Sequence, residues 1–309
     1  MAGMNKIFFG DCRETMKRLI AEGVKVQTCV TSPPYWGLRD YGVEGQIGLE
    51  RTPQEYVEKM VEVFRLVRDL LSEDGTLWLN LGDTYNSSTP GARDAERWPK
   101  QSRNNHVVDK IAAADLKPKD LVGIPWRVAF ALQADGWYLR SDIIWHKPNP
   151  MPESVTDRPT KSHEYIFLMS KNERYYYDHE AIKEPAKDWG PRDRSKSKHN
   201  TDGFRAAGQP PHCGLTIGDY SNGRNKRSVW EVPSQPFSGA HFATFPSALI
   251  EPCILAGSRP VDIVLDPFFG SGTTGQVAEQ LGRQWIGCEI QRGYEPLQKQ
   301  RTAQGGLVL

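Results

Sequence analysis

The segment VDIVLDPFFGSGTTG, residues 261–275, decides how this chain folds. Its apolar start, residues 261–265, predicts a buried strand, and the pattern that continues to Leu281 predicts a helix. Gly270 and Gly272 lie between them, where they allow the backbone to approach a ligand closely. The free amides at the helix N-terminus favour a carboxylate or another acidic group. Strand, glycine-rich turn and helix therefore indicate an α/β fold with a ligand site at the turn.

A second predicted strand, residues 284–289, follows roughly twenty residues after the glycines and ends at Glu289. An acidic residue at that strand tip is placed to accept two ribose hydroxyls. This spacing resembles a dinucleotide fingerprint, which would predict NAD or FAD. The three residues Thr273, Thr274 and Gly275 and the preceding Asp266-Pro267 do not belong to the dehydrogenase pattern, so the turn alone does not identify the nucleotide.

A second motif, TSPPYW at residues 31–36, follows the apolar run of residues 26–30. Consecutive prolines fix φ and present carbonyl oxygens without N–H groups. An exocyclic amino group that donates to Ser32 Oγ and to the Pro33 carbonyl is favoured in a pyramidal form, whose lone pair can attack an electrophile. Tyr35 can stack on the ring that carries this amino group. If this ring is a nucleic-acid base, the base must first be flipped out of its duplex to reach such a pocket. The alternative is an ordinary proline turn after a strand.

The two motifs together resemble those of the amino-group DNA methyltransferases, which transfer a methyl group from S-adenosylmethionine (AdoMet) to cytosine N4 or adenine N6. Residues 268–272 look like the cofactor loop of that family, and the tetrad that looks catalytic is Ser32, Pro33, Pro34 and Tyr35. The tetrad precedes the cofactor loop, an order that resembles the beta subgroup.

The resemblance covers most of the chain and implies where AdoMet binds. Residues 6–12 look like the short strand whose acidic end, Asp11, holds the adenine amino group, and residues 241–246 look like the segment at the methionine end. The stretches that resemble further core strands are residues 75–83, 142–149 and 163–167. The implied AdoMet-binding residues are Asp11, Thr31, Phe245, Asp266, Pro267, Phe268, Phe269, Gly270, Ser271, Gly272, Thr273 and Glu289.

The resemblance also implies a mechanism. AdoMet is expected to lie with its methionine end near Asp266, its ribose on Glu289 and its adenine near Asp11. The flipped base enters from the opposite side, between Ser32 and Tyr35, and its amino nitrogen attacks the methyl group in line. Positive charge moves from sulfur to nitrogen, and a proton then leaves to water. No step needs a metal ion, and the sequence contains no metal-binding motif.

The first residue of the tetrad bears on which base is methylated. Family members that methylate cytosine N4 usually have Ser there, whereas those that methylate adenine N6 usually have Asp. Ser32 therefore favours cytosine N4, with adenine N6 as the alternative. A DNA-binding module that has lost catalysis is a second class of function, but both motifs are intact. An RNA methyltransferase is disfavoured by the motif order.

Composition limits the possible classes of protein. The chain has 309 residues and a formal net charge of +1, and its mean hydropathy is −0.57, so DNA-binding charge must be local. No apolar run has the length of a membrane span, and no signal-peptide pattern is found. The cysteines have no paired spacing, so we expect a reducing cytoplasm of a prokaryotic or phage-infected cell. They are Cys12, Cys29, Cys213, Cys253 and Cys288.

Alternating elements predict a doubly wound, seven-stranded, mostly parallel sheet with one antiparallel strand at its edge. The expected strands are 6–10, 26–30, 76–81, 138–145, 165–170, 261–265 and 284–289. The expected helices are 14–21, 53–71, 125–134, 247–256, 273–281 and 293–302. Because Asp11, Ser32, Asp266 and Glu289 all follow predicted strands, we expect them to share one cleft.

The expected organisation is one methyltransferase domain with an inserted target-recognition region. Residues 1–171 form the catalytic part, with a polar loop at 86–119, and residues 241–309 form the AdoMet-binding part. The insert at 172–240 includes Lys183–Arg227, with ten Lys or Arg against five Asp or Glu. Composition alone fits a solvated, partly disordered insertion, but the beta subgroup has its recognition region at this position.

The expected partner is double-stranded DNA with a specific recognition sequence, and a cognate restriction endonuclease is a second implied partner. Positive side chains supply phosphate contacts and polar ones read base edges. The candidate DNA contacts are Lys147, Asn222, Arg224, Lys226 and Arg227. For Lys147 a purely structural role is the alternative interpretation.

Overall fold

The structure, a computed structural model, describes residues 5–86, 116–185, 223–235 and 245–303. The chain divides into a larger unit, residues 1–178 with 227–309, and a smaller unit, residues 179–226. In its described part the smaller unit has a short 3₁₀ helix, Glu180–Ile182, and a β-bridge between Glu184 and Arg224. All other elements named below belong to the larger unit.

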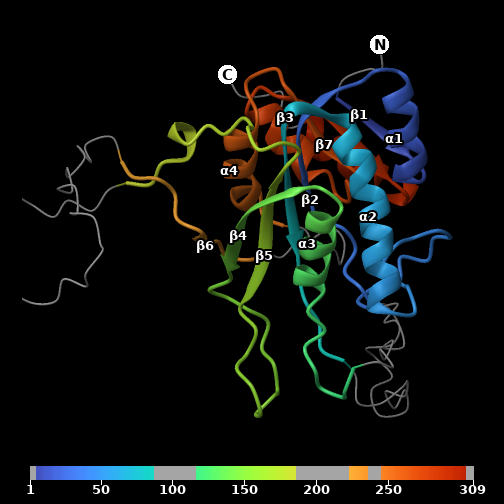
Figure 1. Ribbon diagram of the computed structural model, residues 1–309, viewed down its shortest axis with the longest axis vertical. Helices are drawn as coiled ribbons and strands as arrows, with labels where there is room; N and C mark the ends of the chain where they lie inside the picture. The colour runs from blue at the N-terminus through green and yellow to red at the C-terminus, as the bar shows by residue number, and fades with distance from the viewer. Residues whose placement is uncertain (1–4, 87–115, 186–222, 236–244, 304–309) are drawn as a thin grey trace, which may run out of the picture. The chain divides into compact units, whose positions relative to one another are not determined.

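The larger unit contains a mixed sheet with strand order β1-β8-β7-β2-β3-β5-β4-β6 in the residues that the structure describes. Its strands are β1 Lys6–Phe9, β2 Val26–Thr31, β3 Leu71–Leu81, β4 Tyr138–His146, β5 His163–Ser170, β6 Val229–Glu231, β7 Ile263–Asp266 and β8 Gln284–Glu289. Among the strands that the structure describes, only β5 runs antiparallel to its neighbours, β3 and β4, whereas the other pairs are parallel. The predicted α/β fold is therefore confirmed (Figure 1).

Two details of the predicted sheet were wrong. The antiparallel strand is not at the edge, because β4 forms a hairpin with β5 and lies outside it, from Tyr138 opposite Ser170 to His146 opposite His163. An eighth strand, β6, then pairs with β4. With three residues, of which Trp230 is the buried one, β6 is too short for an alternating pattern to reveal.

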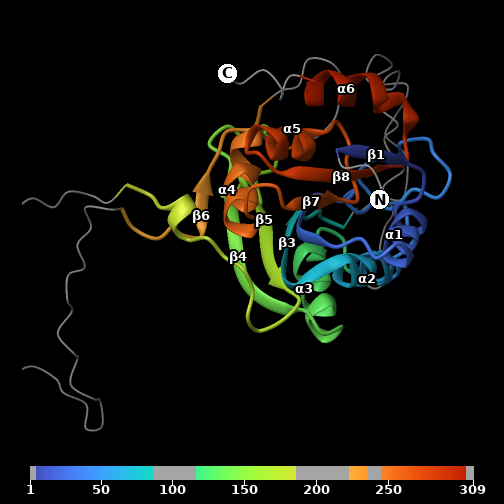
Figure 2. The same cartoon turned by 90° about the horizontal axis from the view of Figure 1, so that it is seen from above.

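Six helices cover the two faces of the sheet in the described part of this unit. Figure 2 shows α1, α2 and α3 on one face and α4, α5 and α6 on the other. Their bounds are α1 Cys12–Ala21, α2 Pro53–Leu70, α3 Ile124–Ala134, α4 Ser247–Gly257, α5 Thr273–Gln280 and α6 Glu295–Ala303. None of these described helices has the length and apolar character needed to span a membrane.

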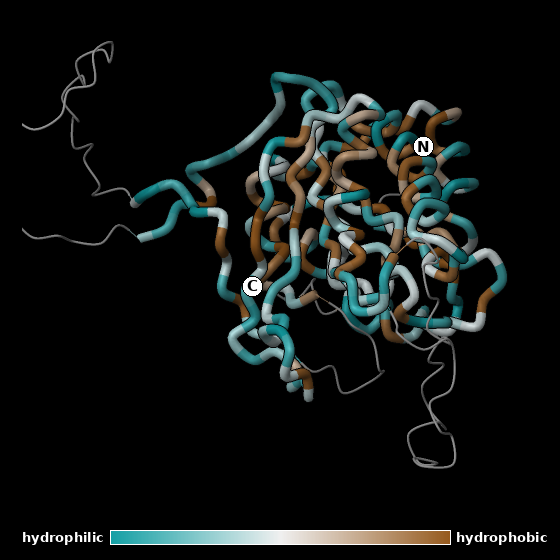
Figure 3. Tube along the Cα trace, turned by 60° about the horizontal axis from the view of Figure 1, so that its bottom comes forward, coloured by the Kyte–Doolittle hydropathy of each residue, from teal (hydrophilic) through white to brown (hydrophobic). Residues whose placement is uncertain are grey.

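Helix α2 shows how local sequence forms these layers. Thr52 accepts the N–H of Glu55 at 3.1 Å as the N-cap, and Pro53 occupies the first turn. One face of the helix carries a fully buried stripe that includes Tyr56, Met60 and Phe64. Burying side chains of this size stabilises a fold by roughly 1.5–3 kcal/mol each. Figure 3 shows apolar residues gathered in the interior of the described fold, with hydrophilic residues toward its outside.

The order of strands reverses between β2 and β7, which lie side by side although they are far apart in the sequence. Their carboxyl ends are joined by a hydrogen bond, in which Thr31 Oγ1 donates to Asp266 Oδ1 at 2.6 Å. Ligands of doubly wound sheets bind at such a reversal, outside the carboxyl ends of the strands. The fold thus places a site beside the residues that follow β2, β7 and β8.

Candidate active site

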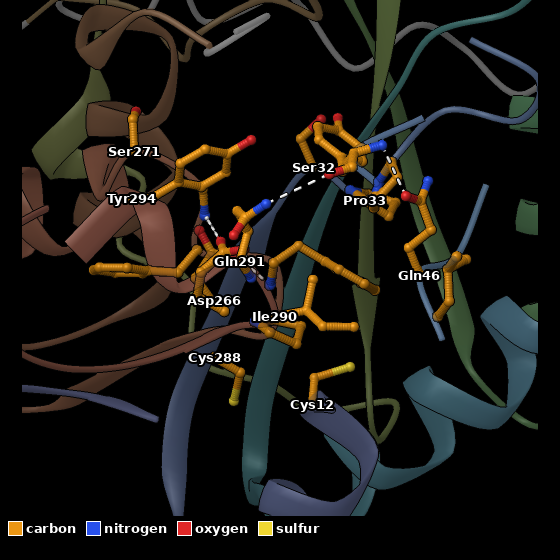
Figure 4. Close-up of a pocket in the computed structure, with 18 of the residues that line it drawn as sticks. Cys12, Ser32, Pro33, Gln46, Asp266, Ser271, Cys288, Ile290, Gln291 and Tyr294 are labelled. Atoms are coloured by element: carbon orange, nitrogen blue, oxygen red, sulfur yellow. Dashed lines mark hydrogen bonds between the residues drawn. The ribbon is translucent and has the colours of Figure 1, made fainter. Parts of the chain in front are cut away.

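A pocket lies at this reversal and joins the two sequence motifs. In Figure 4, Ser32 and Pro33 lie across from Ser271 and Tyr294, with Gln291 between them. The predicted site residues that line it are Asp11, Ser32, Pro33, Pro34, Tyr35, Phe245, Asp266, Pro267, Phe268, Phe269, Gly270, Ser271, Thr273 and Glu289. Thr31 and Gly272 do not line it. Thr31 instead bonds to Asp266, and Gly272 lies against Phe269.

The buried side chain of Asp266 holds the glycine-rich loop in place through hydrogen bonds. Its side chain is 2% exposed and accepts hydrogen bonds from Thr31 Oγ1 at 2.6 Å, from the Phe268 N–H at 3.0 Å and from Thr274 Oγ1 at 2.7 Å. Burial raises the pKa of this carboxyl to about 6, although the three hydrogen bonds favour its charged form. Asp266 therefore fixes the path of the loop and ties it to β2.

Phe269 anchors the same loop against β8. Its ring stacks on Trp285, with centroids 4.9 Å apart, and lies flat over Gly287. A Cβ atom at Gly287 would be 2.4 Å from a carbon of the Phe269 ring, which is closer than any real contact. Glycine is required here because the aromatic ring occupies the space of a side chain.

We expect Gly287→Ala to displace Phe269 and to loosen the cofactor loop. Overpacking of this kind costs about 1–3 kcal/mol, which corresponds to a Tm lower by about 2–10 °C. Thermal unfolding and AdoMet calorimetry measure both effects. Gly293→Ala is the control, because its Cβ would meet no atom closer than 3.5 Å. An unchanged Tm in Gly287→Ala would contradict this packing argument.

Glu289 lies at the tip of β8 with both carboxylate oxygens in use. Oε2 accepts the N–H of Gly270 and Oε1 accepts the N–H of Gln291, each at 2.7 Å. Burial raises the pKa of this group to about 7, the two N–H groups oppose that rise, and the nearby Asp266 adds to it. Glu289 is thus an acceptor on the pocket wall whose charge changes near neutral pH.

Asp11, the second acidic residue on the pocket wall, behaves differently. It caps α1 by accepting the Arg13 N–H at 2.8 Å, and the Arg13 guanidinium binds both of its carboxylate oxygens. Burial acts to raise the pKa of Asp11, but the hydrogen bonds and charge of Arg13 hold it below its ordinary value. Asp11 therefore stays ionised near neutral pH.

The proline-rich segment is fixed by contacts to α2, to the residue that follows β3 and to β5. Tyr56 of α2 donates to the Pro34 carbonyl at 2.9 Å. The Tyr35 ring lies against Gly82, where a Cβ atom would be 2.5 Å from the ring. The Tyr35 hydroxyl donates to Glu164 Oε2 at 2.6 Å, and Ser32 Oγ lies 3.4 Å from the same hydroxyl. The tetrad is thus a rigid part of the pocket wall.

Sequence reasoning missed the loop at residues 37–48, which forms another part of the wall. Its ends are joined by the Gly37 N–H donating to the Gly48 carbonyl at 2.8 Å, and the Tyr41 N–H donates to Gln46 Oε1 at 2.7 Å. The missed lining residues are Gly10, Leu38, Arg39, Tyr41, Gly45, Gln46, Ile47, Ile290, Gln291 and Tyr294. A glycine-rich stretch directly after the tetrad was the one available signal for this loop.

The candidate DNA contacts belong to both units of the chain: Lys147 and Arg227 to the larger one, Arg224 and Lys226 to the smaller one. Lys147 pairs with Glu164 and lies 4.2 Å from the centroid of the Trp145 ring. Arg224 of the smaller unit pairs with Glu184 through both main chain and side chain. Asn222 lies outside the described residues, as do residues 241–244 of the segment expected at the methionine end. The remaining candidates are Lys226 and Arg227, and all five DNA contacts stay a prediction.

The donor and acceptor set of the pocket fits AdoMet. Two carboxylates, Asp11 and Glu289, suit amino and hydroxyl donors, and the apolar walls, which include Phe268 and Ile290, suit a purine ring. Gly270 and Gly272 adopt positive φ angles of 52° and 88°, which form the tight turn that leads into α5. This pocket and the reversed strand β5 define the class of AdoMet-dependent methyltransferases.

Comparison with known proteins narrows the class. A family model described as DNA methylase, N6_N4_Mtase, matches residues 26–300, so the chain belongs to the N6/N4 DNA methylase family. It is 49% identical over 288 residues to the type II methyltransferase M.Cfr9I of Citrobacter freundii, covering 93% of this chain and 84% of that one. It is also 49% identical over 297 residues to M.SmaI of Serratia marcescens, covering 96% and 90% of the two chains.

Solved structures show the same fold at lower identity. PvuII DNA methyltransferase (cytosine-N4-specific) matches with a TM-score of 0.62 and 20% identity, over 96% of this chain and 85% of that one. A putative DNA modification methylase of Thermus thermophilus, complexed with S-adenosylmethionine, matches with a TM-score of 0.59 and 22% identity, over 98% and 95%. The chain is a site-specific amino-group DNA methyltransferase that uses AdoMet.

Proposed function

We propose that the chain methylates cytosine at N4, with the tetrad Ser32, Pro33, Pro34 and Tyr35 as its catalytic residues. The observation that carries this proposal is the position of Ser32, which follows β2 and lines the pocket together with the glycine-rich loop. Serine at this position is typical of the cytosine-N4 members of the family. PvuII DNA methyltransferase, whose fold is similar, is cytosine-N4-specific.

The two acceptors proposed for the amino group are both available in the pocket wall. Ser32 Oγ is one of them, and the Pro33 carbonyl is the other. In the described part of the chain no hydrogen bond uses the Pro33 carbonyl, whereas Tyr56 already occupies that of Pro34. Two acceptors on one nitrogen favour its pyramidal form and hold it for attack. AdoMet supplies an electrophilic methyl group on a sulfonium ion.

The proposed AdoMet contacts are those that the family resemblance implies, carried by residues that line the pocket. Glu289, at the tip of β8, accepts the ribose hydroxyls, and Asp11 accepts the adenine amino group. Thr31 and Asp266 support the glycine-rich loop through their hydrogen bond, and Gly272, within that loop, lies against Phe269. We assign target recognition to the insert at residues 172–240, which contains four of the candidate DNA contacts, Asn222, Arg224, Lys226 and Arg227. A cognate restriction endonuclease fits the type II relatives.

Nucleoside analysis decides which base is methylated. Genomic DNA from a host without amino-group methylases is incubated with the protein and labelled AdoMet, then digested to nucleosides and separated. We expect the label in N4-methylcytosine. Label only in N6-methyladenine would overturn the cytosine proposal, and label in 5-methylcytosine would overturn the amino-group mechanism. Sequencing of modified DNA from cells that express the protein then gives the recognition site.

A further inference from the structure

A charged cluster lies directly behind the tetrad and outside the pocket lining. Glu164, at the start of β5, accepts the Tyr35 hydroxyl at 2.6 Å and the amide of Asn80, on β3, at 3.3 Å. Its other carboxylate oxygen accepts the ammonium of Lys147, which follows β4. The side chains of Glu164 and Lys147 are 15% and 21% exposed. Three strands therefore converge on one carboxylate that holds a tetrad residue.

The direction of the hydrogen bonds follows from the number of protons available. Tyr35 has one hydroxyl proton, and its neighbours are a carboxylate oxygen at 2.6 Å and the Asn80 amide oxygen at 3.2 Å. The charged and closer acceptor makes the stronger bond, so the proton lies toward Glu164. Burial first, and then the Glu164 charge, raise the pKa of Tyr35 well above its ordinary value, so the hydroxyl keeps this proton.

The direction of the Tyr35 hydrogen bond also decides whether the Ser32 hydroxyl donates or accepts toward the pocket. Because the Tyr35 proton points to Glu164, the Tyr35 oxygen is free to accept, and Ser32 Oγ lies 3.4 Å from it. The Ser32 hydrogen then points toward the Tyr35 oxygen. The lone pairs of Ser32 Oγ are left facing the pocket, where they can accept an amino hydrogen. A Ser32 hydroxyl that pointed its hydrogen into the pocket would instead direct a donor at the amino group.

We infer that Glu164 is a positioning residue, which acts through the Tyr35 hydroxyl to orient Ser32 as a hydrogen-bond acceptor. This inference rests on the proposed role of the tetrad. Lys147 and Asn80 hold the carboxylate at the required place, and Lys147 balances its charge in a partly buried site. Because the ammonium group of Lys147 binds Glu164, the structural interpretation of Lys147 is favoured over a contact with DNA phosphate.

The test is a double-mutant cycle with Glu164→Gln and Tyr35→Phe, which remove the charge and the hydroxyl. Removing a hydrogen-bond donor that contacts the reacting centre directly typically lowers kcat by about 10²–10³-fold. Glu164 acts indirectly, so we expect Glu164→Gln to lower kcat by about 10–100-fold. We expect KM for DNA and the Kd for AdoMet, measured by calorimetry, to stay within about twofold of wild type. In the Tyr35→Phe background, Glu164→Gln should cost nothing further, because its effect needs the hydroxyl.

Glu73→Gln is the matched control for the charge change. Glu73 also accepts a lysine and an asparagine, Lys171 at 2.8 Å and Asn172 at 3.1 Å. It lies near the opposite end of β5 and is 80% exposed. We expect wild-type kcat in this variant. If Glu164→Gln destabilises the fold, Glu164→Asp takes its place in the cycle, since it keeps the charge and withdraws it from Tyr35.

The outcomes separate this inference from the proposed function. Losses in kcat that multiply in the double variant would overturn the route through Tyr35, as would wild-type kcat in Glu164→Gln. If Glu73→Gln lowered kcat as much as Glu164→Gln does, the local role of Glu164 would be overturned. If instead Ser32→Ala and Tyr35→Phe both keep full activity, the proposed catalytic site itself is wrong.

Discussion

Replacing Ser32 by alanine should lower kcat by about 10²–10³-fold, the range found when one preorganised hydrogen-bonding group at a reacting centre is removed. The substitution deletes the acceptor for one amino hydrogen and leaves the Pro33 carbonyl alone with the base. The amino lone pair then stays delocalised in the ring, so attack on the methyl group is slower. AdoMet affinity should remain within about twofold of wild type, because Glu289, Asp11 and the glycine-rich loop are unchanged.

The measurements that test this are single-turnover methyl transfer to DNA and AdoMet calorimetry on the same preparation. Ser141→Ala is the control, since Ser141 belongs to β4 and does not line the pocket. It should methylate DNA at the wild-type rate. Full activity in Ser32→Ala would remove the serine from the mechanism, and a matching loss of AdoMet affinity would assign it to cofactor binding instead.

The parts of the site that the sequence predicted share one property: each follows an apolar run. Ser32 follows β2 and Glu289 ends β8, so the rule that ligands bind at the carboxyl ends of parallel strands was enough to bring them together. The glycine-rich loop carried its own signal in Gly270 and Gly272. Local pattern and one rule of sheet architecture thus predicted both walls of the pocket.

The residues that support the site could not be predicted in the same way. Glu164 and Lys147 meet because β4 and β5 form a hairpin, and Glu164 reaches Tyr35 because β5 also pairs with β3. Sequence patterns contain no measure of these distances. The same holds for Asp266, which was expected near the cofactor's methionine end. Its buried carboxylate accepts hydrogen bonds that fix the glycine-rich loop. Its partner Thr31 lies on β2, which the pairing of β2 with β7 brings beside it.

Lowering the pH below about 7 should weaken AdoMet binding, by up to about tenfold per pH unit. The pKa of Glu289 in the free protein is about 7, raised mainly by burial. Only the charged carboxylate offers acceptors to two ribose hydroxyls in addition to the N–H groups of Gly270 and Gln291. Protonation removes part of that capacity. Calorimetry from pH 5.5 to 8.5 measures the dependence.

The stability of the free protein should change in the opposite sense. Because the folded pKa of Glu289 is raised from 4.5 to about 7, its contribution to stability is fully present below pH 4.5 and is lost as pH rises through 7. Asp266, with a pKa raised from 3.8 to about 6, adds a trend of the same sign at lower pH. Denaturant unfolding without AdoMet should therefore give a free energy of unfolding that falls across this range.

Glu289→Gln separates these two effects. The amide has one acceptor oxygen where the carboxylate has two and does not titrate, so we expect AdoMet affinity about 10–100-fold weaker at pH 8 and nearly independent of pH above 6. Asp11→Asn is the control: Arg13 holds the pKa of Asp11 below its ordinary value, so this variant should keep the wild-type pH dependence whatever its affinity. A pH dependence that survives in Glu289→Gln but disappears in Asp11→Asn would assign the titration to the adenine end of the pocket.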